Sequence, residues 1–397
     1  MEALILLIVL VAVSGVLIAP ALRRRRLRKD GQRGMAAAQD PVAGYGFVPA
    51  EELDVRLPGP DRELTEALEE TQRTQDWGPV ARMLALTSDE WELRWQRVQS
   101  LAGAAHMELT RHRAAVAEGA SPASSESGAD SGAVSFSKAP AVQDARWLRE
   151  WRAQEPRDAG GAEVYAQFLV WQALADPAAA EHRIILEEAR NVAHEAARLA
   201  ENDPTPHITE LVIARHLSYR RADFESLWST VRRLAPHHMG AHLAALPYWS
   251  QKWSGSKTEA DGFAQAAAAS APEGTLLPAL PLFALYDHLP EVNMVRGLYQ
   301  SHDVERAIEA AEFAVDQVED DHPVRAHVLH LLVCFLVRAE RYTEAMEALQ
   351  VVDGYVGAVP WVDATSPVAE YAAYRALAVA GWESTGGARE RAEGSGM

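Results

Sequence analysis

The densest group of side chains that could do chemistry lies between residues 237 and 256, where histidine, tyrosine, tryptophan and lysine occur together. His238 and His242 are four residues apart and could share one face of a helix, as two metal ligands would. The glutamate of an HExxH motif is absent, and no third ligand is close in the sequence. We therefore expect no metal and no other cofactor at this position.

The aromatic and basic side chains of the same stretch could line a groove. A lysine among tryptophans can hold a carboxylate or a similar group of a peptide. Alternatively, the aromatic rings pack in a seam between helices with their N–H and O–H groups hydrogen-bonded, and the sequence favours this for most of them. Two hypotheses rest on the same candidate residues: a groove that binds a partner protein or peptide, and, alternatively, an enzyme or ligand-binding site. These residues are His238, His242, Tyr248, Trp249, Lys252 and Trp253.

Other catalytic patterns point away from an enzyme. Residues 254–257 match S-x-x-K, in which the lysine activates a serine nucleophile, but the companion S-D-N and K-T-G elements are absent. We instead interpret Ser256 and Glu259 as a helix capping box. The sequence contains no phosphate-binding loop, dinucleotide fingerprint or G-x-S-x-G elbow. Cys334 is the single cysteine, within an apolar stretch, so we expect it to be buried rather than reactive.

The elements that must position these side chains are helices. Apolar residues recur at offsets 0, 3, 4 and 7 from four anchors, Trp77, Phe224, Val304 and Tyr342. The same spacing recurs thirteen residues upstream of each anchor; it is clear from Leu329 and poorest at Leu211, Ala214, Arg215 and Ser218. This predicts pairs of antiparallel helices, with a turn at residues 339–341. The i, i+4 spacing of tryptophans predicts core packing for Trp77, Trp91, Trp95, Trp147, Trp151 and Trp171.

This spacing resembles the tetratricopeptide repeat, best along Leu329–Leu332–Tyr342–Ala345–Leu349. The chain departs from the repeat where Val333 replaces the glycine of the first helix and Gly357 the closing proline, and its anchors lie 147, 80 and 38 residues apart. Residues 70–290 also look similar to helical proteins of high-GC bacteria that resemble this repeat. The resemblance implies an all-α fold, a degenerate solenoid of helical hairpins, and brings no catalytic residue with it.

The N-terminal region predicts a membrane anchor. Residues 3–22 are an uncharged, almost wholly apolar run of 20, enough for a helix to cross a hydrocarbon core of roughly 30 Å. Six of the seven residues at 23–29 are basic, which places this side in the cytoplasm and the N-terminus outside. A cleaved signal peptide would have its positive charge before the apolar run. An exported chain, with the helical part outside, is the alternative.

The composition along the chain predicts its organisation. We expect a transmembrane helix at 3–22, a basic juxtamembrane segment and flexible tether at 23–60, and a first helical block at 61–117. A disordered Ser/Gly/Ala-rich insertion is expected at 118–142, a helical-repeat domain at 143–384 and a disordered tail at 385–397.

The charge balance bears on the partner. The first 33 residues contain seven basic and two acidic residues. The remaining chain has 31 basic and 54 acidic residues, a net charge of −23. Such a surface repels phosphate backbones and excludes nucleic acid as an expected partner. We expect a scaffold, not an enzyme, that is anchored through residues 3–29, faces the cytoplasm and binds a protein or peptide, with a basic partner favoured.

Overall fold

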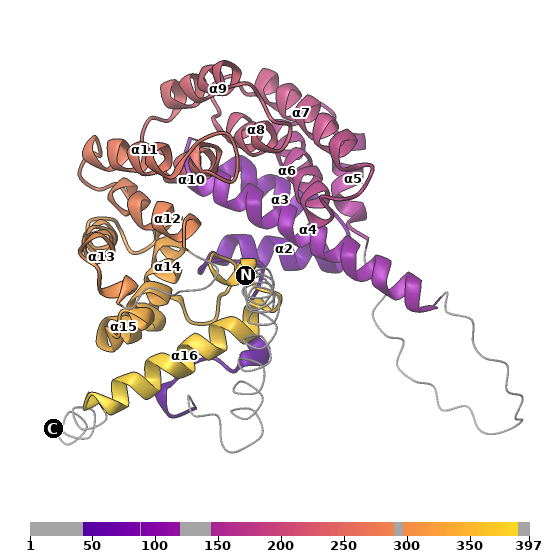
Figure 1. Cartoon of the computed structure of the whole chain (residues 1–397). Helices are drawn as coiled ribbons and strands as arrows, with labels where there is room; N and C mark the ends of the chain where they lie inside the picture. Colours follow the sequence, from indigo (N-terminus) through magenta and orange to yellow (C-terminus); the bar gives the residue numbers. More distant parts are fainter. Residues whose placement is uncertain (1–42, 88, 120–143, 290–296, 388–397) are drawn as a thin grey trace, which may run out of the picture. The chain divides into compact units, whose positions relative to one another are not determined.

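The computed structural model describes residues 43–87, 89–119, 144–289 and 297–387. Within these ranges the protein is all-α, as predicted, with fifteen α-helices labelled α2–α16 and no strand (Figure 1). The expected transmembrane helix at 3–22, the insertion from residue 120 and the tail from residue 388 lie outside the described residues. None of the helices within the described ranges combines the length and apolar character that a membrane crossing requires.

The described chain forms two compact units. The large unit comprises residues 59–287 and 309–328, and the small unit comprises the described parts of residues 1–58, 288–308 and 329–397. The helices on the two sides of the insertion, α4 (Trp91–Gly119) and α6 (Ala159–Ala175), pack against each other within the large unit. The insertion therefore does not separate the two units.

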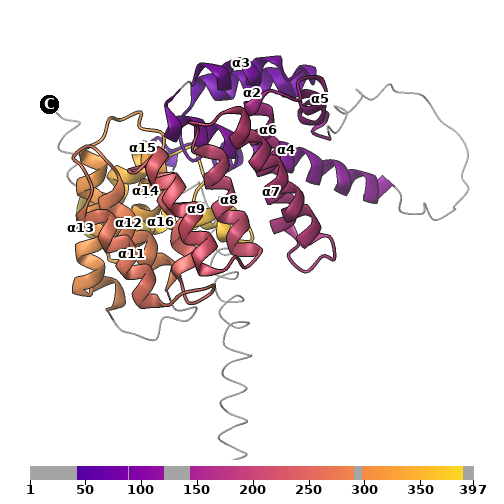
Figure 2. The same cartoon turned by 90° about the horizontal axis from the view of Figure 1, so that it is seen from above.

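The large unit is a series of helices that pack on their sequence neighbours. Figure 2 shows α7, α8 and α9 side by side. Its remaining helices are α2 (Arg62–Thr74), α3 (Gly78–Leu86), α5 (Arg146–Gln154), α7 (His182–Leu199), α8 (Thr205–His216), α9 (Arg221–Leu234), α10 (Met239–Ala245), α11 (Lys257–Ala269) and α12 (Leu280–Asp287), with 3₁₀ turns η3 (Leu246–Trp249) and η4 (Leu277–Ala279). Helices α13 (His302–Asp316) and α14 (Arg325–Arg338) run from one unit into the other.

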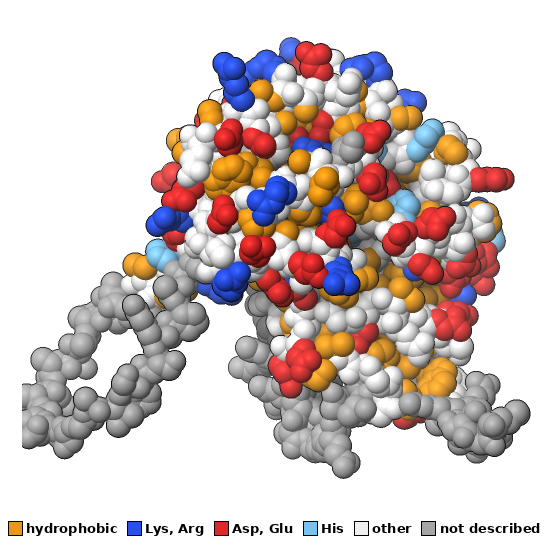
Figure 3. All heavy atoms as spheres, turned by 180° about the vertical axis from the view of Figure 1, so that it is seen from behind, with side chains coloured by type: hydrophobic (Ala, Val, Ile, Leu, Met, Phe, Trp, Pro, Cys, Tyr) orange, Lys and Arg blue, Asp and Glu red, His pale blue; other side chains and the backbone are white. Residues whose placement is uncertain are grey.

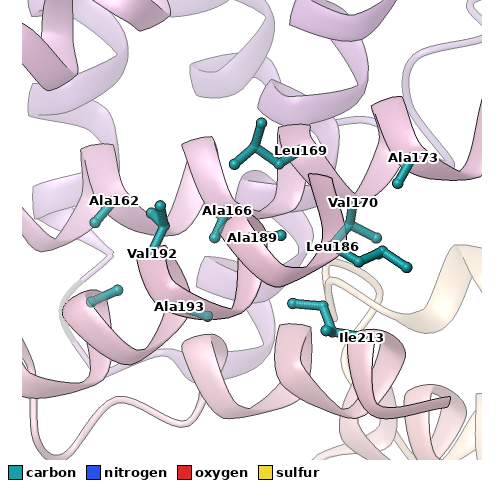
Figure 4. Close-up of a cluster of buried hydrophobic side chains, with 11 residues drawn as sticks. Ala162, Ala166, Leu169, Val170, Ala173, Leu186, Ala189, Val192, Ala193 and Ile213 are labelled. Carbon is teal, nitrogen blue, oxygen red and sulfur yellow. The ribbon is translucent and has the colours of Figure 1, made fainter. Parts of the chain in front are cut away.

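The hairpin of α6 and α7 shows how these helices bury their apolar faces (Figure 4). Its core is dominated by alanine, whose short side chain lets two helix backbones approach closely. Ile213 of α8 closes the cluster from the next hairpin, so each pair depends on its neighbour for burial. The buried residues are Ala162, Ala166, Leu169, Val170 and Ala173 from α6, Leu186, Ala189, Val192, Ala193 and Ala196 from α7, and Ile213.

The predicted turn at residues 339–341 is confirmed, and its backbone explains the sharp reversal. Glu340 has a φ of 63°, and the N–H of Arg341 donates to the carbonyl of Leu336 at 2.9 Å. The end of α8 repeats this geometry, with Ser218 at φ 56° and a bond from Tyr219 N–H to the Ala214 carbonyl at 2.9 Å. These are Schellman C-caps in which a residue other than glycine adopts the left-handed conformation.

Five of the six tryptophans predicted to pack in the core are wholly or partly buried. Trp147 and Trp151 are fully buried, Trp95 is buried, and Trp77 and Trp91 are partly covered. Trp77 stacks on Trp151 with ring centroids 5.9 Å apart. For Trp171 the prediction is wrong, because its side chain lies on the outer face of α6 and is 37% exposed.

The small unit contains α15 (Tyr342–Val352), α16 (Pro367–Ser384) and four 3₁₀ turns, η1 (Ala43–Tyr45), η2 (Ala50–Glu52), η5 (Leu298–Gln300) and η6 (Trp361–Asp363). The described part of the expected tether, from residue 43, is packed here rather than extended. Leu53 and Leu57 are buried, and residues 54–57 exchange backbone hydrogen bonds with residues 354–357. Gly357 permits this, because a Cβ there would lie 2.5 Å from the Leu57 carbonyl.

The same N-terminal segment is bound to α16 by a buried ion pair. The N–H of Val48 donates to Asp353 at 2.5 Å, and the Arg375 guanidinium donates to the Val48 carbonyl at 2.7 Å. Arg375 also pairs with Asp353 at 2.9 Å. The tether prediction failed at these residues because it weighed local composition, whereas the contacts join residues more than 300 positions apart.

Candidate functional site

His238 caps a helix. The sequence predicts a helix end at residues 235–236 followed by a new start, and α9 does end at Leu234 while α10 begins at Met239. The Nδ1 atom of His238 accepts from the N–H of Ala241 at 3.2 Å, and Nε2 lies 3.2 Å from the carbonyl of Trp91. These partners assign the proton to Nε2. Burial lowers the pKa of His238, so the ring is neutral at pH 7.

Glu92 joins α4 to the start of α10. Its carboxylate accepts from the N–H of Met239 and lies 2.9 Å from Nε2 of His322, in the loop before α14. Although burial favours the neutral acid, the contacts with His322, His238 and Met239 hold the pKa of Glu92 below its usual range. Residues 319–321 of this loop are exposed, and the partly buried His322 anchors its end to Glu92.

His242 packs one turn further along α10. Its Nδ1 lies 3.0 Å from the carbonyl of His238, and its ring meets the ring of Trp228 edge to face at 4.9 Å. Burial lowers the pKa of His242 to about 4. The two histidines therefore use their Nδ1 atoms in backbone hydrogen bonds instead of presenting them together. The described residues contain no group of three His, Cys, Asp or Glu side chains arranged to hold a metal.

Tyr248 and Trp249 form the predicted aromatic seam. Tyr248 stacks on Phe224 with ring centroids 3.6 Å apart, and its hydroxyl donates to the Tyr219 carbonyl at 2.9 Å. Trp249 meets both of these rings edge to face and packs on Phe263 of α11. Four of the six candidate residues are thus buried between helices. His238 lies where α10 meets α4, and His242, Tyr248 and Trp249 lie where α10 and η3 meet α9 and α11.

A tight loop carries the other two candidates. Residues 250–256 fold back on η3. The N–H of Ser254 donates to the backbone carbonyl of Tyr248 at 3.2 Å, and the N–H of Ser256 donates to the backbone carbonyl of Trp249 at 3.0 Å. Gly255 is required for this approach, since a Cβ would lie 2.1 Å from the carbonyl of Trp249. The loop projects Lys252 and Trp253 outward, and the Trp253 side chain is 40% exposed.

Ser256 ends this loop as a cap of α11. Its hydroxyl accepts from the N–H of Glu259 at 3.2 Å, as the capping box predicts. The reciprocal bond differs, because the Glu259 carboxylate accepts from the hydroxyl of Ser256 at 3.0 Å and binds Arg221 at 2.6 Å. The S-x-x-K match therefore falls on a structural turn.

Three further residues, Arg215, His216 and Asp287, lie beside Lys252 and Trp253. The sequence analysis did not predict them as site residues. The Arg215 guanidinium lies over the Trp253 ring at 5.1 Å, and the His216 ring meets Trp253 at 4.6 Å. Asp287 lies 3.3 Å from the ammonium of Lys252. One signal was present: Arg215 occupies a position of the apolar stripe on α8, where the repeat spacing is poorest. We call Arg215, Lys252, Trp253 and Asp287 the Arg215 edge.

The electrostatics of the Arg215 edge are unusual. Burial lowers the pKa of Arg215 to about 10, although Asp287 opposes this. Burial, Arg215 and His182 lower the pKa of His216 to about 4. At pH 7 the edge therefore carries two cations and one carboxylate, beside the neutral imidazole of His216.

A second polar cluster, also missed, lies in the interior of the large unit. Arg94 of α4 binds Glu163 of α6 at 2.9 Å and Asp203 at 2.5 Å. It also donates to the carbonyl of Leu84 at 3.0 Å. Burial and the neighbouring Asp203 raise the pKa of Glu163 well above its usual value, with Arg94 opposing. Because the cluster is closed to solvent, its role is to join α4, α6 and the start of α8.

Comparison of the chain with protein-family models, curated proteins and solved structures finds no match.

Proposed function

We propose that this chain is a helical-repeat scaffold that binds a protein or peptide and is held at a cell membrane by one span. The helix pairs α2/α3, α8/α9 and α14/α15, each joined by a short turn, support a degenerate solenoid similar to tetratricopeptide repeats. The apolar run at 3–22 and the basic residues at 23–29 support the anchor, with the N-terminus outside and the helical part in the cytoplasm.

The observation that carries the binding proposal is the Arg215 edge. Partner contacts in protein interfaces are enriched in tryptophan and arginine. Here Trp253 is 40% exposed on a loop held by backbone hydrogen bonds, with Lys252 beside it and Arg215 against its ring. A side chain presented in one fixed conformation loses little entropy when a partner covers it.

The charge of the chain supports a basic partner through long-range attraction. Acidic side chains are spread over the face shown in Figure 3, with basic ones among them, and the whole chain carries a net charge of −18. Such a field speeds the encounter with a cation, whereas the exposed ring of Trp253 supplies a short-range contact that determines how long the partner stays. The two effects act on different parts of the surface.

The test is capture of partners from native membranes by the full chain and by the variant Trp253→Ala. We expect a partner that is retained at low salt, released at high salt and lost in the variant. Leu86→Ala, which truncates another exposed apolar side chain, is the matched control and should retain it. If the variant Trp253→Ala captures the partner equally well, the binding surface does not include Trp253. The absence of any salt-sensitive partner would contradict the proposal.

The membrane topology is tested separately. A reporter that works only in the cytoplasm should be active when fused to the C-terminus, and one that works only outside the cell should be inactive there. The protein should also remain with membranes after an alkaline wash. A reporter active outside the cell would reverse the orientation. Recovery of the chain in the soluble fraction would contradict the anchor.

A further inference from the structure

Two arginines of the large unit lie over tryptophan rings, and only one of them is paired. Arg221 lies 4.9 Å from the Trp249 ring and binds Glu225 at 3.0 Å and Glu259 at 2.6 Å. Arg215 lies 5.1 Å from the Trp253 ring. Its Nε atom is buried without a partner. The guanidinium therefore has an unused Nε–H donor beside an exposed aromatic ring.

Holding a cation in this state costs stability. The Nε–H donor of Arg215 is removed from water without an acceptor, so it loses hydration and gains little in return. Asp287 attracts it but does not accept from it, because one carboxylate oxygen binds Lys252 and the other is buried without a partner. An incoming carboxylate would accept charge-assisted hydrogen bonds from this guanidinium.

The local charge has the sign that attracts an anion. Arg215 and Lys252 are positive, Asp287 is negative, and the neighbouring imidazoles of His216 and His182 contact each other at 6.0 Å. His216 is neutral at pH 7 because its pKa is about 4. The surplus of one positive charge stands out in a chain with a net charge of −18.

The exposed ring of Trp253 specifies the rest of the ligand. Its position is fixed by the loop at residues 250–256, the His216 ring packs against it at 4.6 Å, and 40% of the side chain remains exposed. Aromatic rings favour other flat groups in offset or edge contacts, worth about 0.5–1.5 kcal/mol beyond area burial. A planar apolar group would therefore gain more here than a flexible chain.

We propose that the Arg215 edge is a binding site for an aromatic carboxylate. The carboxylate accepts from Arg215 and Lys252, and its aromatic group packs on Trp253. This assigns a small-molecule site beyond the proposed scaffold function, and it holds whether or not a macromolecular partner binds the same edge.

The test uses benzoate as the probe, with the full chain in detergent micelles, by calorimetry and by the indole N–H signal of Trp253. We expect saturable binding that shifts this signal. Benzamide has the same shape without the charge and should bind at least tenfold more weakly. The inference is overturned if benzoate shows no saturable binding, if benzamide binds equally well, or if phenyl phosphate binds more tightly than benzoate.

Variants locate the site. Arg215→Gln should weaken benzoate binding at least tenfold, whereas Arg221→Gln, at the paired arginine over Trp249, should leave it unchanged. An equal loss in both variants would overturn the assignment. If Arg215→Gln unfolds, Lys252→Gln decides, because that side chain is 66% exposed and its loss cannot disturb the core. A weaker benzoate affinity in Lys252→Gln supports the site, and an unchanged affinity contradicts it.

Discussion

Arg94 and Glu163 meet in the interior of the large unit, with Nη2 and Oε2 2.9 Å apart. They belong to α4 and α6, which lie on opposite sides of the insertion in the sequence. Asp203 gives this cluster a second acid for a single cation. A buried group with one positive charge and two carboxyls is most stable when one carboxyl keeps its proton, and the raised pKa of Glu163 identifies which one.

The first prediction concerns the pH dependence of Glu163→Gln. Because the pKa of Glu163 is raised in the folded state, the folded chain binds this proton more tightly than the unfolded chain. Its contribution to stability is complete below the unfolded pKa and is lost as pH rises toward the folded pKa, by up to about 1.4 kcal/mol per pH unit. The amide cannot ionise, so the variant should gain stability relative to the parent chain as pH rises. Urea unfolding at several pH values measures this, and a constant difference would contradict it.

The second prediction concerns Arg94→Met. Removing the cation leaves Glu163 and Asp203 buried without their donor, which should lower the free energy of unfolding by about 3–5 kcal/mol. Arg62→Met, at an exposed arginine paired with Glu66, is the control and should change it by less than about 1 kcal/mol. Denaturant melts of both variants provide the comparison. Equal small effects would show that the interior ion pair is dispensable.

A third prediction follows from His242. Its pKa is about 4 in the folded state and about 6.5 when unfolded, so the unfolded chain binds more protons between these values. Stability should therefore fall as pH drops from 6.5 toward 4, by about 3 kcal/mol in total from this residue. His242→Gln should remove only the share of the slope that this residue contributes, because burial also lowers the pKa values of His216 and His327 to about 4. His237→Gln, at the exposed neighbour, should retain it, and an identical slope in all three proteins would refute the assignment.

The fourth prediction tests the turn between α14 and α15. Glu340 has a φ of 63°, a conformation that costs a residue with a Cβ roughly 1 kcal/mol and that glycine adopts freely. Glu340→Gly should therefore raise the stability by about 1 kcal/mol. Glu347→Gly, within α15, should lower it by a similar amount. Thermal melting distinguishes them, since the two changes remove the same side chain and should shift Tm in opposite directions.

The sequence was informative about helices and turns because their signals are local. The offsets around Tyr342 and Leu329 predicted a helix pair whose turn is observed at residues 339–341, and the break at residues 235–236 predicted the start of α10. The spacing of Trp147 and Trp151 correctly indicated their burial. Each of these signals depends on residues within two helical turns of one another.

The candidate site was predictable only in part, for the opposite reason. The stretch at 237–256 contains both the buried seam and the exposed pair Lys252 and Trp253, and periodicity cannot tell which rings another helix will cover. Arg215 and Asp287 reach the site from helices distant in sequence. The same holds for Glu163 and for the packing of residues 43–57, whose partners lie far along the chain.

The attachment of Val48 to Asp353 and Arg375 also has a mechanical consequence. A pull on the chain ahead of residue 43 loads Tyr45 first, whose hydroxyl donates to Glu383 of α16 at 2.5 Å. The bonds of Val48 with Asp353 and Arg375 are loaded next, and Arg375 passes the tension to the middle of α16. Because the carboxylate and the guanidinium resist this tension together, the last helix, although remote from the N-terminus in sequence, is the first element to bear the strain.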